Sequence, residues 1–215
     1  MKKFKMYNLK ELSKVMQSLS ETDKRNTIGA GIVYKFDSKG KLETSYDDGT
    51  TGPNKVICNG NELIIDGTLN YSSECYVDES GDRHIGHNIT GGGINLFYFL
   101  ADNTNVEWGA SYNDGSQAHI NTYHDEHSCN VSYQEGFSNY IHSHTTSGDS
   151  QSLASSSDIS TGVAMLRRSN NQNDEYDYNY QKFSIYKAHS AGSIDEDTID
   201  YTDDVESIYD QYYGD

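Results

Sequence analysis

Two histidines two positions apart are the residues whose types and spacing most clearly suggest chemistry. His142 and His144 follow the apolar pair Tyr140-Ile141, a pattern typical of a β-strand. Side chains two residues apart on a strand point to the same side, so both imidazoles can face one ion. A carboxylate from a following helix, such as that of Asp158, would complete three protein ligands and leave one position open. This spacing predicts the layout of a catalytic zinc site.

A hydrolytic zinc site also needs a carboxylate that takes a proton from water without binding the metal. Glu107 is the best candidate, because it lies near the start of a strand predicted over residues 106–112. The small residues Gly109 and Ala110 beside it leave room for a substrate. We therefore predict that Glu107 is the general base.

The elements expected around these residues combine helices with a sheet. Apolar spacing indicates a helix over residues 94–102, and a second helix over 158–168 that begins at Ser157-Asp158 and ends at Arg167-Arg168, where the charges complement the helix dipole. Alternating side chains predict strands over residues 106–112, 118–123, 130–133, 139–144 and 182–186. The fold class predicted from these elements is α+β, with a mixed β-sheet flanked by helices.

Four regions are expected along the chain. Apolar residues at helical spacing predict a helix over residues 8–20, and short strands separated by Asp-Gly and Asn-Gly turns follow it. The run of acids near the C-terminus is expected to be either a free tail or a docked amphipathic helix. The predicted regions are an N-terminal helix (1–25), a β-rich N-terminal extension (26–90), the domain with the candidate site (91–192) and an acidic C-terminal tail (193–215).

The composition excludes several classes of partner. The net charge of −17 opposes a general grip on nucleic acid or on an anionic membrane surface. No apolar run approaches the roughly 20 residues that span a bilayer, and the N-terminal segment lacks the apolar core of a signal peptide.

The three cysteines, Cys58, Cys75 and Cys129, are far apart. We expect them to be reduced thiols and not a disulfide framework.

The order of the candidate residues resembles a known motif. Glu107, His142-Ser143-His144 and Ser155-Ser156-Ser157-Asp158 are similar to the JAMM motif of the JAB/MPN metallopeptidases, which reads Glu, His-x-His and Ser-x-x-Asp. Residues 99–108, 124–126 and 141–144 further resemble the JAB-like toxin branch at the C-termini of bacterial Rhs-type polymorphic toxins. The resemblance covers about residues 94–190. It implies a JAB/MPN-like mixed β-sheet flanked by helices, with a β-rich N-terminal extension.

The resemblance also implies a function and roles for residues. His142, His144 and Asp158 would hold Zn²⁺, Glu107 would be the general acid/base, and Ser155 would donate a hydrogen bond to the oxyanion. The implied reaction is hydrolysis of a peptide or isopeptide bond in a protein substrate. The implied protein is a toxin effector, made in the bacterial cytoplasm and delivered into a target cell by a dedicated secretion system. Its expected partner is a cognate immunity protein.

The chain departs from the family pattern in the loop before the third ligand. The family usually has a shorter loop and a Pro directly after the second His, whereas Thr145 follows His144 here and 13 residues separate His144 from Asp158. A surface loop absorbs a few extra residues at little entropic cost. Asp149 is a rival third ligand. Asp158 is preferred because its Ser-x-x-Asp context and the following helix would fix the direction of its carboxylate.

Two functions from other classes compete with the enzyme. One is a non-catalytic MPN-type scaffold that binds protein without zinc, and the other is an acidic adhesin or carbohydrate-binding β-domain. A scaffold does not need the complete set of motif residues that this chain contains. An adhesin or carbohydrate-binding domain does not explain the spacing of His142, His144 and Asp158.

Simpler roles are expected for the remaining conspicuous residues. Trp108 is predicted to pack in the core, and the glycines at 91–93 to form a turn. His84 and His87 are expected in a loop, and His189 at the end of a strand. Residues 124–127 are predicted to form a solvated turn, with a position at the rim of the metal site as the alternative.

Overall fold

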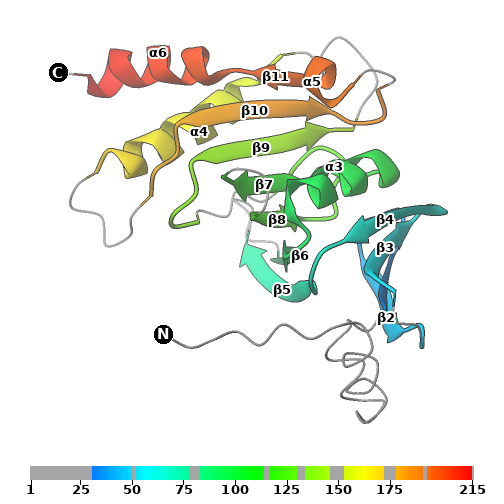
Figure 1. The fold of residues 1–215 in the computed structure, drawn as a ribbon. Helices are drawn as coiled ribbons and strands as arrows, with labels where there is room; N and C mark the ends of the chain where they lie inside the picture. Colours follow the sequence, from blue (N-terminus) through cyan, green and yellow to red (C-terminus); the bar gives the residue numbers. More distant parts are fainter. Residues whose placement is uncertain are drawn as a thin grey trace, which may run out of the picture.

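The computed structural model describes residues 31–49, 52–77, 83–113, 117–129, 134–145, 153–171, 178–190 and 193–214, and Figure 1 gives their arrangement. The strands are β1 (Ile32–Phe36), β2 (Leu42–Asp47), β3 (Asn54–Cys58), β4 (Asn61–Ile65), β5 (Asn70–Val77), β6 (Arg83–Thr90), β7 (Gly109–Tyr112), β8 (Ala118–Thr122), β9 (Asn139–His144), β10 (Lys182–Lys187) and β11 (Thr198–Asp200). The helices are α3 (Gly93–Asn103), α4 (Ser156–Ser169), α5 (Ile194–Asp197) and α6 (Thr202–Tyr213). The helix predicted over residues 8–20, the strand predicted over 130–133 and the rival ligand Asp149 lie outside the described residues.

A seven-stranded mixed sheet forms the centre of the molecule, with the strand order β11-β10-β9-β7-β8-β6-β5. Strands β9 and β10 are parallel, and the other neighbours in this sheet are antiparallel. Together with the helices, this mixed sheet confirms the predicted α+β class. Among the described residues, no helix combines the length and the apolar character needed to cross a membrane.

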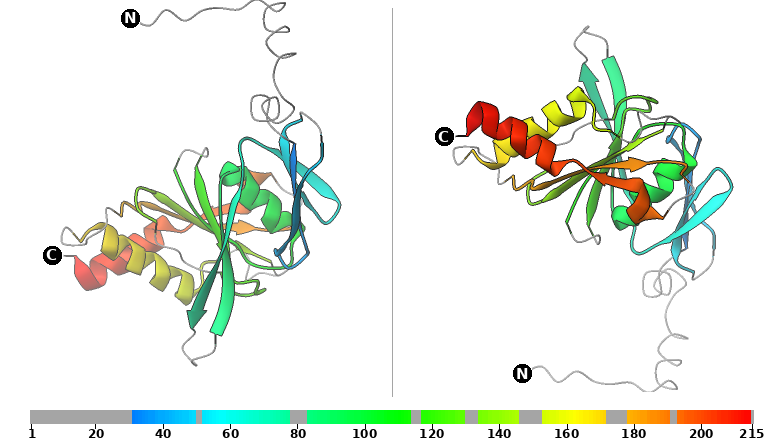
Figure 2. Two further views of the ribbon diagram at one scale, coloured as in Figure 1. Left: turned by 90° about the horizontal axis from the view of Figure 1, so that it is seen from below. Right: turned by 90° about the horizontal axis from the view of Figure 1, so that it is seen from above.

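Helices cover both faces of this sheet. On β9, Ile141 belongs to the buried cluster that contains α3, and its neighbour Tyr140 belongs to the cluster that contains α4 and α6. Because successive side chains on a strand point to opposite faces, α3 lies on one face and α4 with α6 on the other, as Figure 2 shows. The helices predicted over residues 94–102 and 158–168 correspond to α3 and α4.

Strands β5 and β6 belong to the central sheet, although both lie before residue 91. They form an antiparallel hairpin, and β6 also pairs with β8 of the central sheet. His84 and His87 therefore lie on a strand and not in the predicted loop. The polar sequence of residues 83–90 concealed this strand, because pairing on both sides satisfies the backbone of β6 whatever the polarity of its side chains.

The four-stranded sheet β2-β1-β3-β4 shares its core with the central sheet. Trp108 is fully buried in this shared core, and its Nε1 donates a hydrogen bond to Thr104 Oγ1 at 2.8 Å. A Cβ atom at Gly40, which has φ +70°, would lie 2.5 Å from the Trp108 ring. The predicted packing role of Trp108 is confirmed, and Gly40 allows the turn after β1 to lie against it.

The C-terminal segment is part of the domain. Strand β11 pairs with β10, and α6 packs on α4 through Val205, which is fully buried. A Cβ at Gly162 of α4 would lie 2.6 Å from Val205 Cγ2. The acids Asp203 and Asp204 are exposed in the first turn of α6, where they complement the helix dipole. Residues 193–214 therefore form a docked strand and helix, and not a free acidic tail.

Candidate metal centre

His142 and His144 project from the α4 side of strand β9. This strand lies between β7 and β10. It pairs with β10 from Asn139 to His144 and with β7 from Asn139 to His142, and Ser143 N donates to Trp108 O at 2.8 Å, so the backbone next to both imidazoles is held. The Nε2 atoms of the two rings lie 3.1 Å apart. The two-residue alternation of the strand thus places both ligand nitrogens at one point.

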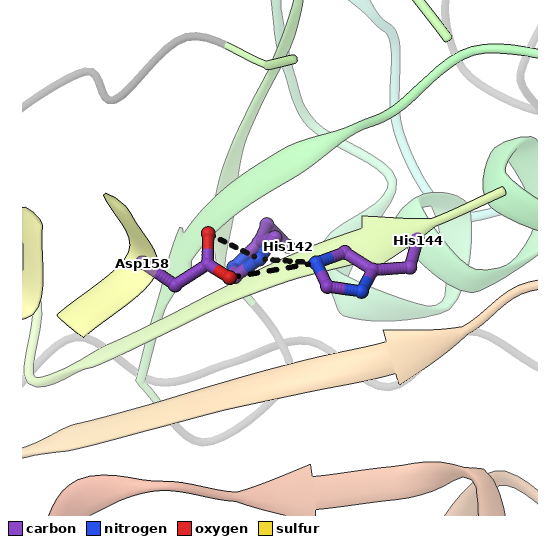
Figure 3. A group of neighbouring side chains, drawn as sticks. All are labelled: His142, His144 and Asp158. Carbon is purple, nitrogen blue, oxygen red and sulfur yellow. Dashed lines mark hydrogen bonds and ion pairs between the residues drawn. The ribbon is translucent and has the colours of Figure 1, made fainter. Parts of the chain in front are cut away.

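Asp158 reaches the same point from the first turn of α4. Ser155 is the N-cap residue, and its Oγ accepts a hydrogen bond from Asp158 N at 3.1 Å. Asp158 Oδ2 in turn accepts one from Ser155 N at 2.7 Å, which completes a capping box. Asp158 Oδ1 lies 3.2 Å from His142 Nε2, and Oδ2 lies 3.7 Å from His144 Nε2 (Figure 3). The cap that starts the helix therefore also aims the carboxylate.

The protonation states of these groups suit metal binding. Burial lowers the pKa of His142, so the imidazole is neutral at pH 7. Burial by itself would raise the pKa of Asp158, but hydrogen bonds from His142 and His144 hold it well below its ordinary range. A neutral imidazole and an ionised carboxylate are the forms that bind metal.

The donor set fits a divalent transition metal. The ligand atoms of His142, His144 and Asp158 all lie within 4.8 Å of one another. Two imidazole nitrogens and one carboxylate oxygen form a set that Zn²⁺ accepts. Within the described parts of the chain, this is the one group of three or more such residues gathered closely enough to hold a metal ion.

Glu107 lies in the same pocket, just before β7. Its backbone N donates to Asp125 O at 2.8 Å, and its carbonyl accepts from Thr122 Oγ1 at 2.7 Å. The residue is 9% exposed. Burial raises the pKa of the Glu107 carboxyl to about 7; the charge of His144 opposes this shift, and Asp158 and Asp125 add to it. A carboxyl group with a pKa near neutrality can both accept and return a proton at working pH.

The pocket has a volume of about 400 Å³ and contains all five residues predicted for the site. The other lining residues are His127, Ser128, Cys129, Tyr140, Leu153, Ser157, Thr161 and Tyr201. His127 and Ser128 place one end of the 124–127 segment at the rim, in agreement with the alternative considered for that segment. Tyr201 was missed because it comes from the C-terminal segment, and no local pattern connects that segment with β9.

His87, His124 and His189 are among the histidines that lie away from this pocket. His87 and His124 contact each other through Nδ1 and Nε2, respectively. His189 follows β10, as predicted, and its Nε2 forms a hydrogen bond with Thr104 O at 3.0 Å. None of these three lines the pocket with the candidate ligands.

A mixed sheet between α3 and α4, with three candidate metal ligands on β9 and at the start of α4, defines an α+β protein of JAB-like type. Residues 93–190 match the family model described as JAB-like toxin 1. This part of the chain is therefore similar to the JAB-like toxin family, which confirms the resemblance to JAB-like toxins stated from the sequence. Comparisons with curated proteins and with solved structures found no match.

The family match contains the candidate site but not the whole fold. It starts at the first residue of α3 and ends three residues after β10. It thus includes Glu107, the three candidate ligands and Ser155. Strands β1 to β6, strand β11 and helices α5 and α6 lie outside it.

Proposed function

We propose that this protein is a zinc-dependent metalloprotease or isopeptidase that acts as a toxin effector. The observation that carries the proposal is the convergence of His142, His144 and Asp158 on one point, in a pocket that also contains the buried carboxyl group of Glu107. The match of residues 93–190 to the family model described as JAB-like toxin 1 supports the toxin role.

The three ligands would hold Zn²⁺ and leave a position toward the pocket open. The chemistry that a bound Zn²⁺ supplies is Lewis acidity, which makes water a nucleophile at neutral pH and polarises a carbonyl group. The capping box at Ser155 and the paired strand β9 keep the ligands in place. Little reorganisation is then needed when the metal binds.

Glu107 and Ser155 would carry out the steps around the metal. Glu107 takes the proton from the attacking water and gives it to the leaving nitrogen of the peptide or isopeptide bond. Ser155 Oγ accepts from Asp158 N, so its hydroxyl hydrogen is available to donate to the oxyanion of the tetrahedral intermediate. Ser155 can therefore keep its cap contact with Asp158 while it donates to the oxyanion.

The expected setting is competition between bacteria. The effector would be made in the bacterial cytoplasm and carried into a target cell by a dedicated secretion system, as part of an Rhs-type toxin. Its substrate would be a protein, and its partner in the producing cell would be an immunity protein. The net charge of −17 favours such protein partners over nucleic acid.

The test compares the wild type with Glu107→Gln, with Glu126→Gln as a matched control. Glu126 is exposed and does not line the pocket. We expect about one bound zinc per chain in all three proteins. We expect hydrolysis and growth inhibition to fall by about 10²–10⁴-fold in Glu107→Gln alone. Equal toxicity of the wild type and Glu107→Gln would contradict the enzyme, and a wild type without zinc after incubation with the metal would contradict the metal site and favour a non-catalytic scaffold.

A further inference from the structure

We infer that Tyr201 is a positioning residue of the metal centre, whose hydroxyl group accepts a hydrogen bond from His142 Nδ1 and holds the imidazole with Nε2 toward the metal. The inference rests on the proposed function, because it concerns the same site. Tyr201 lies outside the residues that match the family model. It would be a part of the centre that this chain supplies from its own C-terminal segment.

The first observation is the orientation of the His142 ring and the lack of a partner for its Nδ1. Its Nε2 lies 3.2 Å from Asp158 Oδ1 and 3.1 Å from His144 Nε2, so Nε2 is the nitrogen that faces the candidate metal position. When a metal takes the place of the Asp158 contact, Nε2 must offer its lone pair, and a neutral imidazole then carries its hydrogen on Nδ1. His142 is 4% exposed, and among the described residues Nδ1 has no hydrogen-bond partner. A buried donor of this kind calls for an acceptor.

The second observation is the state of Tyr201. Its side chain lines the metal pocket and is 3% exposed, and its hydroxyl group is likewise without a hydrogen-bond partner among the described residues. The phenol ring meets the His142 ring edge to face, with centroids 6.2 Å apart and an interplanar angle of 80°. A phenol oxygen can accept as well as donate. Two buried polar groups that lack partners therefore lie on rings in contact.

Among the described residues, Tyr140, Phe183 and Ile185 also neighbour His142 on this face, and none of them provides an equivalent acceptor. Tyr140 stacks on the imidazole with centroids 5.9 Å apart, but its hydroxyl group lies 3.7 Å from Cys129 Sγ. Phe183 and Ile185 from β10 are apolar members of the same buried cluster. The Tyr201 hydroxyl group is therefore the acceptor that we assign to His142 Nδ1, reached by a rotation of the Tyr201 side chain.

The fold holds Tyr201 under His142 through contacts on both sides of the residue. Tyr201 N donates to Phe183 O at 3.0 Å, and Tyr201 O accepts from Val205 N at 3.2 Å. Val205 lies against Gly162 of α4, the helix that begins next to Asp158. The same segment therefore supports two ligands, His142 through Tyr201 and Asp158 through α4. Metal-binding histidines generally have such an outer partner on the second ring nitrogen.

The experiment measures zinc affinity of the purified full chain by competition with a chromophoric chelator. Tyr201→Phe removes only the hydroxyl group, and we expect it to weaken zinc binding by about 10–100-fold. The control is Tyr180→Phe. Tyr180 is fully buried in the same cluster, but its hydroxyl group pairs with Ser111 Oγ and Gln134 N, both at 2.8 Å. The control should lower thermal stability and leave zinc affinity unchanged.

The outcomes separate this inference from the proposed function. Zinc binding by the wild type with equal affinity in Tyr201→Phe would overturn the role of Tyr201 and leave the proposed function standing. Equal losses in Tyr201→Phe and Tyr180→Phe would show a general packing effect and would also overturn it. Failure of the wild type to bind zinc would overturn both proposals.

A measurement on the wild type covers the case in which Tyr201→Phe does not fold. NMR of isotope-labelled histidine in the zinc-loaded protein reports which ring nitrogen carries hydrogen. We expect His142 to have a protonated Nδ1 whose hydrogen exchanges slowly with solvent, because it is buried and bonded. A hydrogen on Nε2, or rapid exchange at Nδ1, would overturn the inference.

Discussion

Two pairs of histidines meet in this protein, and they differ in what surrounds their nitrogens. The rings of His142 and His144 have centroids 5.0 Å apart, and those of His87 and His124 have centroids 4.6 Å apart. Both pairs are close enough to share an ion. Within the described part of the chain, only the first pair forms a group with a carboxylate, that of Asp158, close enough to hold a metal ion.

The second pair, His87 and His124, is part of a continuous series of hydrogen bonds from Lys39 to Ser73. His124 Nδ1 donates to Lys39 O at 2.6 Å, because a carbonyl oxygen can only accept. His124 Nε2 contacts His87 Nδ1, and His87 Nε2 pairs with Ser73 Oγ at 3.0 Å. This series connects the turn after β1 with β5, β6 and the segment after β8.

The comparison teaches that proximity of histidines does not make a metal site. A site needs donor atoms that converge on one position and an acid that balances the charge of the ion. The Nε2 atoms of His142 and His144 converge with the carboxylate of Asp158, whereas the nitrogens of His87 and His124 are engaged by Ser73, Lys39 and each other. We interpret His87 and His124 as residues that stabilise the contact between the four-stranded and the seven-stranded sheet.

The largest expected effect comes from removing the acid. Asp158→Ala leaves both imidazoles in place but deletes the charged third ligand, so we expect zinc affinity to fall by more than about 100-fold, beyond the usual effect of losing an outer-shell partner. His87→Ala, which breaks the other pair, should keep about one zinc per chain. Metal analysis after dialysis measures both. Retention of zinc by Asp158→Ala would instead direct attention to Asp149 as the ligand.

A smaller effect is expected where α4, which carries Asp158, meets α6. In Gly162→Ala the new methyl group would lie 2.6 Å from Val205 Cγ2. Overpacking of this kind costs about 1–3 kcal/mol, and alanine regains up to about 1 kcal/mol of helix propensity. We expect a net loss of about 1–2 kcal/mol in the free energy of unfolding, measured with urea. The double variant Gly162→Ala, Val205→Ala should lose less than the sum of the single variants; strict additivity would argue against this contact.

The smallest effect concerns the pH dependence of stability at the second pair. Burial, together with His124 and Lys41, lowers the pKa of His87 to about 4, from 6.5. The unfolded chain therefore takes up a proton at His87 before the folded chain does as pH falls. This contribution to stability is complete above pH 6.5 and is lost between 6.5 and about 4.

Because His87 is partly exposed, we expect a contribution of only about 1 kcal/mol after allowing for solvent screening. The measurement is the difference between the unfolding free energies of the wild type and His87→Gln across this pH range. His142 titrates in both proteins, so its effect cancels in the difference. Parallel profiles would contradict the lowered pKa of the half-buried His87.

The parts of the fold that could be predicted are those with local patterns. Alternation in residues 139–144 and 182–186 predicted β9 and β10, and the apolar spacing after Ser157 predicted α4. Strand β6 could not be predicted in this way. Its residues alternate poorly in polarity, and its pairing with β5 and β8 was invisible to a local pattern.

By itself the sequence determined which side chains would act together locally. The two-residue spacing of His142 and His144 puts both imidazoles on one side of a strand, and the Ser-x-x-Asp order makes Ser155 and Asp158 partners in a helix cap. These relations depend on backbone periods of a few residues, so they hold in any fold that keeps the strand and the helix.

Only the tertiary structure decided what surrounds those side chains. The burial that raises the pKa of Glu107 to about 7, the approach of Tyr201 to His142, and the engagement of His87 and His124 by Ser73 and Lys39 all depend on segments far apart in the chain. Burial and hydrogen-bond partners are set by the packing of the whole molecule, and no local period encodes them.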